Sequence, residues 1–493
     1  MQRQITIFTN RQFKDILMKK MEDFKDEKDE KIKKMSGWSN TNFSSSFVVK
    51  PENIEQIKST IRETKDRGGK IIAIGAGQSY GDQGLNDKQT VIDISKINDI
   101  IEWNKSTGIL KIQAGVTFEK ILIHCLKDNW VLPVVPGTRH VTVGGAISSN
   151  VHGKNSYSKG NFGDWVKEFK IILASSECIR CSRENNRDLF FAVIGGCGLF
   201  GIITEITLQL IQVPSPFLSI KKSTSVSLDK LISNLDEMAK KNEYAIAQVD
   251  CFPKNNQLGR GTIHAGSFVS DNSKFVDTKK FAKISKRIFL IFPKKLIPLI
   301  GRCVLNDHIM RLVSGLKYYV DKMVKNDGLL RQDFFQFTFF LDGIPGWKKV
   351  FGHGFYEYEP LIPREKAGDV MARLIRLTHE YKMPPYLSAV KIHKKDEFLL
   401  SYSMDGYSLA MDIPRRPQEK EKQNELFRKM NKIVIDAGGI VYLTKDANLT
   451  PEEFRFMYKN IERFLALKRK YDPDLIFQSD MYRRIFQNNA QIK

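Results

Sequence analysis

Residues that suit an anion-binding backbone crowd the stretch from 134 to 163, which reads VVPGTRHVTVGGAISSNVHGKNSYSKGNFG. Glycines allow positive φ angles and leave no Cβ between the backbone and a ligand. Several N–H groups of such a run can therefore face one anion, as in a pyrophosphate site. A purely structural glycine-rich loop has the same composition, so this stretch alone does not choose between the two interpretations.

A second glycine-rich turn lies upstream, in residues 71–86 (IIAIGAGQSYGDQGLN). An apolar, strand-like run leads into Gly75, Gly77 and Gly81, an arrangement in which backbone donors can meet phosphate. Residues 90–98 (TVIDISKIN) then resume as a strand, whereas a nicotinamide-binding G-x-G-x-x-G turn opens a long helix. The usual nicotinamide-binding unit is therefore not supported.

A third turn, IGGCGLFG at 194–201, is followed by an alternating strand over 202–210. Three glycine turns flanked by strands are hard to explain as structural loops alone. They favour a bound phosphate-containing ligand.

Lys445, in YLTKDA, follows an apolar strand-like run. Burial would lower the pKa of its amine, which suits a proton relay or a substrate-orienting role. The alternative is a surface lysine paired with Asp446. His152 and Lys154, in HGKN, lie within the central glycine-rich stretch, although a lone histidine is more often structural than catalytic.

Eight motifs in this chain stand in the order found in one flavoprotein group: MSGWSN (35–40), GAGQSYGDQGLN (75–86), PGTRHVTVGGAISSNVHGKNSYSKGNFG (136–163), GGCGLFGIIT (195–204), LGRG (258–261), MDIPR (411–415), YLTKDA (442–447) and DPDLIFQSDMYRR (472–484). The chain resembles the vanillyl-alcohol oxidase / p-cresol methylhydroxylase superfamily, and within it the decaprenylphosphoryl-β-D-ribose oxidases. The motifs span most of the chain from residue 35, and HGKN combined with TKD is the specific part.

The resemblance implies an α+β fold. A two-lobed FAD-binding domain of the p-cresol methylhydroxylase type is joined to an antiparallel-sheet substrate (cap) domain and a C-terminal helical segment. Tyr80 stands where relatives with covalently linked flavin carry a histidine, so the FAD is expected to be non-covalent. The residues expected to bind FAD are Gly75, Gly77, Gln78, Ser79, Tyr80, Gly81, Asp82, Asn86, Pro136, Gly137, Thr138, Thr142, Gly144, Gly145, Ser148, Ser149, Asn150, His152, Gly153, Lys154, Asn155, Gly198, Gly201, Ile202 and Tyr442.

The same resemblance assigns catalytic positions to Lys445, Tyr442, His152 and Lys391. Lys391, in AVKIHK, would line the substrate pocket, although it also reads as a solvated strand end. Lys154 would direct positive charge toward a phosphate or reduced flavin. No metal site is expected. The substrate pocket would comprise Glu357, Glu359, Ser408 and Ala410.

Two departures from the ribose oxidases concern this pocket. Glu357 and Glu359 replace two glutamines, and Ala410 replaces a cysteine found in those best known as drug targets. An ionised glutamate only accepts hydrogen bonds, whereas glutamine also donates. Carboxylates also disfavour a nearby phosphate unless lysines neutralise them, so the identity of the sugar stays open.

The activity implied is FAD-dependent oxidation of a secondary sugar hydroxyl to a keto-sugar, with hydride transfer to flavin N5. The 2-hydroxyl of a polyprenyl-phosphoryl ribose is the leading substrate, in a 2′-epimerisation completed by a separate short-chain dehydrogenase/reductase. The main alternative is a soluble sugar or aldonolactone oxidase using oxygen, such as one acting on D-arabinono-1,4-lactone. An alternative of another class is a non-catalytic flavin- or membrane-binding protein.

The composition, 42% hydrophobic and 27% charged with a net charge of +22, describes a globular protein that attracts anionic partners. No nucleic-acid-binding motif is present, and Cys178 and Cys181 lack the further ligands of a zinc site. The basic, apolar segment 279–302 favours a peripheral membrane surface, with a substrate-covering flap as the alternative. We expect a cytoplasmic protein, since the polar N-terminus lacks the apolar core of a secretory signal.

Four regions follow from these patterns: a charged N-terminal extension (1–34), the FAD domain (35–213), the substrate domain (214–416) and a C-terminal segment (417–493) that returns to the flavin site. Helices are expected at 51–68, 117–129, 187–193 and 367–383 and at the start of the C-terminal segment. Strands are expected at 243–252, 334–342 and 354–363 and over GIVYLTKDA (439–447).

Overall fold

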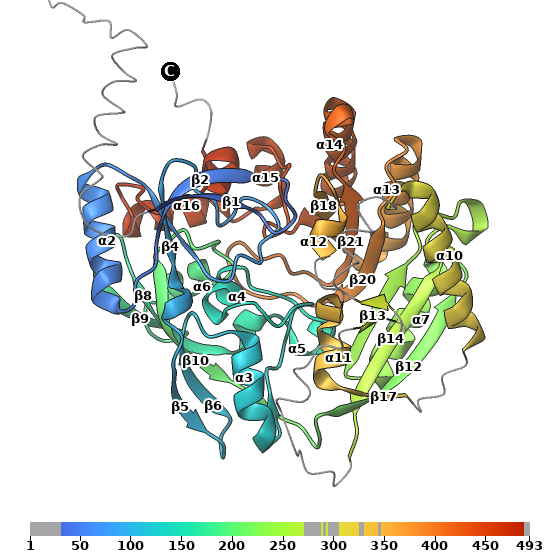
Figure 1. The fold of residues 1–493 in the computed structure, drawn as a ribbon, viewed down its shortest axis with the longest axis horizontal. Helices are drawn as coiled ribbons and strands as arrows, with labels where there is room; N and C mark the ends of the chain where they lie inside the picture. The colour runs from blue at the N-terminus through green and yellow to red at the C-terminus, as the bar shows by residue number, and fades with distance from the viewer. Residues whose placement is uncertain are drawn as a thin grey trace, which may run out of the picture.

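The computed structural model describes residues 31–270, 287–288, 292–293, 305–324, 330–343 and 347–487 (Figure 1). Most of the charged extension at 1–34 and of the basic segment at 279–302 lies outside these residues. Among the described helices, none combines the length and the apolar character needed to cross a bilayer.

The first lobe is a four-stranded sheet with the order β1-β2-β4-β3. β4 (Thr90–Asp93) runs parallel to both β2 (Phe43–Val49) and β3 (Ile71–Ile74), and β1 (Lys31–Ser36) is antiparallel to β2. α2 (Ile54–Asp66) connects β2 to β3 and buries its apolar face. The last residues of the predicted charged extension therefore belong to this sheet.

The second lobe is a five-stranded antiparallel sheet with the order β5-β6-β10-β8-β9. A two-stranded ribbon of β7 and β11 lies beside it, and α4 contacts β10. The elements are β5 (Ile100–Asn104), β6 (Ile109–Gln113), α3 (Phe118–Cys125), β7 (Trp130–Val131), α4 (Val143–Ser148), α5 (Ser156–Lys159), β8 (Val166–Ile172), β9 (Cys178–Ser182), α6 (Arg187–Val193), β10 (Ile202–Gln209) and β11 (Ile211–Gln212).

A nine-stranded sheet forms the other half of the molecule, in the order β17-β12-β14-β13-β20-β21-β19-β22, with β18 also pairing with β21. Its strands are β12 (Phe217–Ser225), β13 (Tyr244–Val249), β14 (Gly261–Phe268), β17 (Leu330–Asp333), β18 (Phe355–Tyr358), β19 (Pro360–Pro363), β20 (Leu387–His393), β21 (Gly406–Pro414) and β22 (Ile440–Val441). All their pairings are antiparallel. This arrangement and the two lobes confirm the predicted α+β class.

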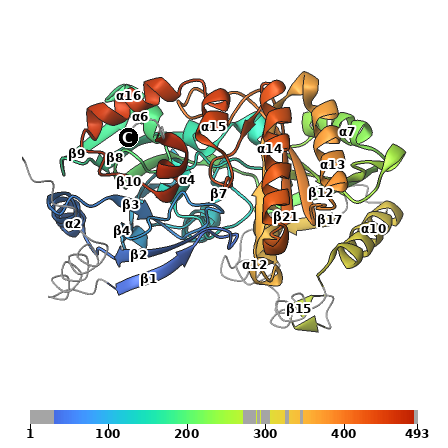
Figure 2. The ribbon, with the colours of Figure 1, turned by 90° about the horizontal axis from the view of Figure 1, so that it is seen from above.

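Helices pack against this sheet. α7 (Leu228–Lys241), α13 (Ala367–Glu380) and α14 (Lys420–Asp436) lie along one face (Figure 2). α10 (Asp307–Met323) contacts two other strands of the sheet's path, β12 and β14. The predicted amphipathic helix at 367–383 is confirmed as α13.

The C-terminal segment returns to the two lobes. α15 (Pro451–Met457) and α16 (Ile461–Tyr471) follow β22, and the rings of Phe464 and Phe200 lie 4.9 Å apart between their centroids. The N–H of Ile71 donates to the carbonyl of Ile476 (2.8 Å). The last described turn, η10 (Tyr482–Phe486), is π-helical.

One strand prediction is wrong, and a second is correct only in its first part. The aromatic run at 334–342 forms α11 (Phe334–Thr338) and the 3₁₀ turn η7 (Phe340–Gly343), because Asp333 accepts a hydrogen bond from the Gln336 N–H and caps a helix there. The strand predicted over GIVYLTKDA (439–447) is confirmed only for Ile440–Val441, which form β22, and the YLTKDA motif forms the turns that follow.

Candidate active site

A deep cavity lies where the two lobes meet the nine-stranded sheet. The glycine-rich turns line one part of it, and β13, β18, β20 and β21 line another. The volume open to the centres of water-sized molecules is about 260 Å³, many times the roughly 10–15 Å³ that one buried water needs. The cavity is therefore large enough to hold an extended ligand.

The glycine turns fit closely together around this cavity. A Cβ on Gly75 would lie 2.0 Å from Oγ1 of Thr142, so the turn after β3 touches the start of α4. Gly77 and Gly198 have φ angles of +63° and +76°, which side-chain-bearing residues rarely adopt. A Cβ on either glycine would meet only one methyl group within 4 Å, that of Ile74 for Gly77 and that of Ile72 for Gly198. These glycines expose backbone to the cavity, as a bound pyrophosphate requires.

The donor set fits FAD. Backbone groups of the three glycine turns surround the cavity, with apolar residues such as Ile74 and Val141 between them for a ring system. The buried Oε1 of Gln83 faces this lining without a hydrogen-bond partner in the described residues, although its Nε2 donates to Ser149 (3.2 Å). A ligand with a hydrogen-bond donor at this point would give the Gln83 Oε1 the partner that a buried polar atom normally has.

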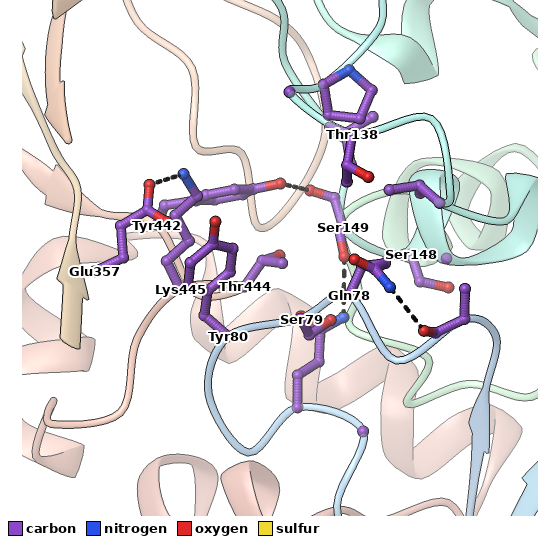
Figure 3. A pocket seen from close by; sticks show the side chains of 18 of the residues that line it. Gln78, Ser79, Tyr80, Thr138, Ser148, Ser149, Glu357, Tyr442, Thr444 and Lys445 are labelled. Atoms are coloured by element: carbon purple, nitrogen blue, oxygen red, sulfur yellow. Dashed lines mark hydrogen bonds and ion pairs between the residues drawn. The ribbon is translucent and has the colours of Figure 1, made fainter. Parts of the chain in front are cut away.

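An ionic cluster of Glu357, Glu359, Lys391, Lys445 and His152 forms the part of the site beside the sheet. Glu359 is fully buried and lies at its centre: its carboxylate is 2.7 Å from Nζ of Lys445, 3.4 Å from Nζ of Lys391 and 3.6 Å from Nε2 of His152. Lys445 also pairs with Glu357, toward which it points in Figure 3. Two carboxylates and two amines thus balance in charge.

These contacts set the protonation states. Burial opposes the charges of both Glu359 and Lys445, yet their charged neighbours prevail. Lys391 and then Lys445 hold the pKa of Glu359 well below its usual value, and Glu357 and then Glu359 raise the pKa of Lys445. The predicted lowering of the Lys445 pKa is therefore wrong. Burial and then the charge of Lys391 lower the pKa of His152 to about 4, so it is neutral at pH 7.

Lys154 lies at another part of the cavity wall and pairs with no carboxylate among the described residues. Its amine donates to the carbonyl of Phe337 and lies 4.6 Å from the centroid of that ring. Burial and then the charge of Lys391 lower the pKa of Lys154 to about 7. This amine can therefore change charge near neutral pH.

Two tyrosines frame the ionic cluster. The hydroxyl of Tyr442 donates to the Ser149 carbonyl (2.8 Å) and ties the C-terminal segment to the glycine-rich stretch (Figure 3). The Tyr80 ring lies 4.8 Å from that of Trp38 and 5.9 Å from that of Phe355, and Lys445 Nζ is 5.2 Å from its centroid. Tyr80 therefore joins the first lobe to the lysine.

Most of the predicted site residues come together here. Those that line the cavity are Gly75, Gly77, Gln78, Ser79, Tyr80, Gly81, Pro136, Gly137, Thr138, Thr142, Gly144, Gly145, Ser148, Ser149, His152, Gly153, Lys154, Gly198, Gly201, Glu357, Lys391, Ala410, Tyr442 and Lys445.

Seven do not line it: Asp82, Asn86, Asn150, Asn155, Ile202, Glu359 and Ser408. Asp82 binds Arg484 through both oxygens, and Asn155 donates to the Pro133 carbonyl (2.7 Å). Asn150 donates to Asp396 (2.9 Å). Ser408 donates to Glu359 (3.2 Å) and so supports the central carboxylate of the ionic cluster.

Several residues that the structure brings to the site were not among the predicted site residues. Gln83 lies in the motif GAGQSYGDQGLN and Thr444 in YLTKDA, so their place in these motifs could have marked them as site residues. Gln248, on β13, lines the cavity, and its buried Oε1 has no hydrogen-bond partner within the part of the chain that the structure describes. The alternation of side chains along a strand predicts which face Gln248 lies on, but not which ligand binds at that face.

Comparison with known proteins agrees with this geometry. Residues 45–182 match the FAD binding domain family, and residues 206–485 match the D-arabinono-1,4-lactone oxidase family. The chain is 29% identical to the decaprenylphosphoryl-β-D-ribose oxidase of Mycolicibacterium smegmatis, over 92% of this chain and 97% of that protein. It is 22% identical to the L-gulonolactone oxidase of Bos taurus, over 92% and 98%.

The match to FAD-binding and oxidase sequences confirms the expected cofactor, FAD, and the expected superfamily. The second family match covers more than half of the 493 residues. The chain therefore belongs to the D-arabinono-1,4-lactone oxidase family, whose place in the vanillyl-alcohol oxidase / p-cresol methylhydroxylase superfamily makes it an FAD-dependent oxidoreductase acting on sugar-like alcohols.

Proposed function

We propose that this enzyme oxidises a secondary hydroxyl of a sugar to a ketone, and that its substrate is a polyprenyl-phosphoryl ribose oxidised at the 2-hydroxyl. The observation that carries the proposal is the ionic cluster on the cavity wall. It places amines and a carboxylate beside the part of the cavity that the glycine-rich turns line, where FAD is expected to bind and which is called the FAD groove below. Similarity to a decaprenylphosphoryl-β-D-ribose oxidase along nearly the whole chain supports this substrate.

FAD, when bound, supplies the hydride acceptor. Lys445 is held protonated by two carboxylates, so it donates a hydrogen bond to the reacting sugar oxygen and does not act as the base. Glu357 lines the cavity and is the carboxylate placed to receive the hydroxyl proton. Lys391 and Lys154 add positive charge that would attract a phosphate.

A lactone or free-sugar oxidase is the second candidate, because Glu357 offers the cavity an acceptor suited to neutral hydroxyls. Similarity to an L-gulonolactone oxidase and the family match support it. In this case Lys391, which pairs with Glu359, would serve only to neutralise that carboxylate.

We also propose a peripheral membrane surface formed by α10. The same role expected of the segment 279–302 stays a prediction, because most of that segment lies outside the described residues. The helix and its C-cap residue, Val324, expose one apolar row, with exposed fractions from 49% to 80%: Leu312, Val313, Leu316, Tyr319, Val320, Met323 and Val324. Exposed Arg311 and Lys322 flank this row. Apolar residues with flanking cations fit the surface of an anionic bilayer.

The position of α10 supports delivery of a lipid-linked substrate. Thr262 of β14 donates to Asp321 of α10 (3.1 Å) and is the cross-strand partner of Gln248, which lines the cavity. Cross-strand partners share one face of a sheet. α10 and the cavity therefore lie on the same face, opposite α7 and α13.

In a 2′-epimerisation pathway, a separate short-chain dehydrogenase/reductase would then reduce the keto-sugar that this enzyme forms.

Anaerobic bleaching of the flavin absorbance distinguishes the substrates. Purified enzyme would be mixed with farnesyl-phosphoryl ribose, its arabinose epimer, an aldonolactone and free ribose. The proposal expects rapid bleaching by the lipid-phosphoryl ribose and a keto-sugar product. Bleaching by the lactone alone would replace it with the second candidate, and bleaching by none of the four would contradict both.

A further inference from the structure

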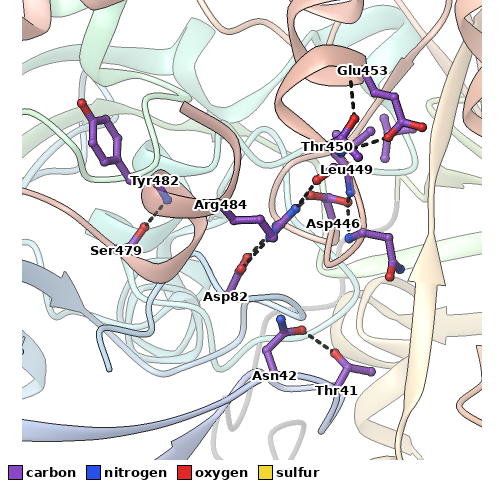
Figure 4. Close-up of polar contacts among 12 residues, drawn as sticks. Thr41, Asn42, Asp82, Asp446, Leu449, Thr450, Glu453, Ser479, Tyr482 and Arg484 are labelled. Atoms are coloured by element: carbon purple, nitrogen blue, oxygen red, sulfur yellow. Dashed lines mark hydrogen bonds and ion pairs between the residues drawn. The ribbon is translucent and has the colours of Figure 1, made fainter. Parts of the chain in front are cut away.

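The motif DPDLIFQSDMYRR near the C-terminus has no part in the chemistry above, yet Arg484 within it touches two turns beside the cavity, one that carries Tyr80 and one that carries Lys445. Its Nε and Nη2 bind the two carboxylate oxygens of Asp82, each at 2.8 Å. Its Nη2 lies 2.9 Å from Oδ2 of Asp446, and its Nη1 donates to the Leu449 carbonyl (2.8 Å). Figure 4 shows this guanidinium between the two turns.

Both carboxylates depend on this arginine. Asp82 and Asp446 have side chains only 4% and 3% exposed, and Arg484 is the only cation that pairs with either in the part of the chain described. Asp446 also shapes its own turn, since its Oδ1 accepts from the N–H groups of Asn448 (2.8 Å) and Leu449 (2.9 Å). Without Arg484, two buried carboxylates would face each other across the junction.

The two turns thus joined are those of Tyr80 and Lys445. The N–H of Tyr80 donates to the carbonyl of Thr444 (3.0 Å), and a Cβ on Gly81 would lie 1.8 Å from the carbonyl oxygen of Asp446. Asp82 lies two residues after Tyr80, and Asp446 directly follows Lys445; Tyr80 and Lys445 both line the cavity. A shift of either aspartate would therefore move Tyr80 or Lys445.

We propose that Arg484 is a positioning residue: it fixes the Lys445 turn against the Tyr80 turn and so holds the amine in its place beside the FAD groove. Arg484 does not line the cavity, so it acts through the two turns and touches neither substrate nor cofactor. The structural part of this inference is independent of the substrate, while its effect on turnover rests on the proposed function.

Hydrogen exchange measured by mass spectrometry tests the structural part on the FAD-loaded enzyme. We expect Arg484→Ala to increase exchange in peptides covering both 79–85 and 443–449, with no change in α13. Guanidinium ion at low millimolar concentration should restore protection, since it can occupy the vacated site. Arg484→Lys, which keeps the charge but loses the fork-shaped contacts, should show an intermediate increase and serves if the alanine variant does not fold.

Arg483→Ala is the matched control, because Arg483 binds Asn86 (2.8 Å) and Asp480 (2.5 Å) and no residue of the Lys445 turn. With the substrate that bleaches the wild type, Arg484→Lys should lower kcat about tenfold or more with a smaller change in KM, because geometry is lost and binding groups remain. Wild-type exchange in both peptides of Arg484→Ala, or equal loosening in Arg483→Ala, would overturn the inference. Failure of every substrate would leave the exchange result standing and remove only the turnover part.

Discussion

Glu357 and Glu359 lie two residues apart and share Lys445, yet their surroundings give them different tasks. Glu359 is fully buried among Lys391, Lys445 and His152, whereas Glu357 lines the cavity. The sequence identified both as departures from the ribose oxidases but not which one reaches the ligand. Nor did it predict the raised pKa of Lys445, because the carboxylates that raise it are distant in sequence.

Replacing each glutamate by glutamine separates these tasks. Glu359→Gln leaves two buried amines without their shared carboxylate and should lower the free energy of unfolding by about 3 kcal/mol. Glu357→Gln should cost little stability but slow flavin bleaching, since the cavity loses its proton acceptor. Urea unfolding and anaerobic stopped-flow absorbance measure the two effects. Equal losses of stability in both variants would contradict the assignment.

Lys154 should give the enzyme a pH dependence near neutrality. Its pKa is lowered to about 7 by burial and by Lys391, so the amine is charged below that pH and neutral above it. KM for a phosphoryl sugar should therefore rise as the pH increases through 7, while KM for a neutral lactone stays level. Lys154→Met should remove this dependence, and Lys394→Met, at an exposed lysine bound to the Ser158 carbonyl, should keep it. A profile unchanged in Lys154→Met would contradict the role.

At the scale of elements, the glycine turns were predictable and the contacts between them were not. The strand, turn and glycine pattern at 71–86 correctly predicted β3 and residues that line the cavity. The aromatic run at 334–342 has strand propensity, but the cap at Asp333 and tertiary packing make it helical. Which glycines allow two turns to touch depends on segments far apart in the chain.

Gly81 shows what such a contact requires. A Cβ there would lie 1.8 Å from the Asp446 carbonyl oxygen, so Gly81→Ala should push apart the Tyr80 and Lys445 turns and cost roughly 1–3 kcal/mol of stability. Gly352→Ala, where nothing lies within 4 Å, should change stability by less than about 0.5 kcal/mol. Thermal unfolding followed by circular dichroism compares them. Similar melting temperatures for the two variants would contradict the close contact.

At the scale of the whole molecule, the cavity exists only because segments distant in sequence converge. Lys445 and Arg484 come from the C-terminal segment, which packs back onto the two lobes, while the nine-stranded sheet supplies Glu357 and Lys391. The sequence motifs indicated the shared site through their resemblance to a family. The apolar row on α10 had no such motif and emerges only from its exposure in the folded chain.

Binding to lipid vesicles tests the proposed role of α10. The enzyme should float with anionic vesicles at low salt, and binding should weaken as salt rises, because cations contribute to it. Leu316→Asp combined with Val320→Asp should abolish flotation. Ile101→Asp, at a 45% exposed apolar residue on β5, should leave it unchanged. Undiminished flotation of the double variant would contradict a membrane surface on α10.

The most direct test of the central claim is the rate of anaerobic flavin bleaching in Lys445→Met. This substitution removes the amine that Glu357 and Glu359 hold protonated beside the cavity. Loss of one preorganised donor predicts bleaching slowed about 100-fold or more, with normal FAD content and with Lys394→Met as fast as the wild type. Wild-type bleaching in Lys445→Met would show that the ionic cluster is not the reacting part of the site.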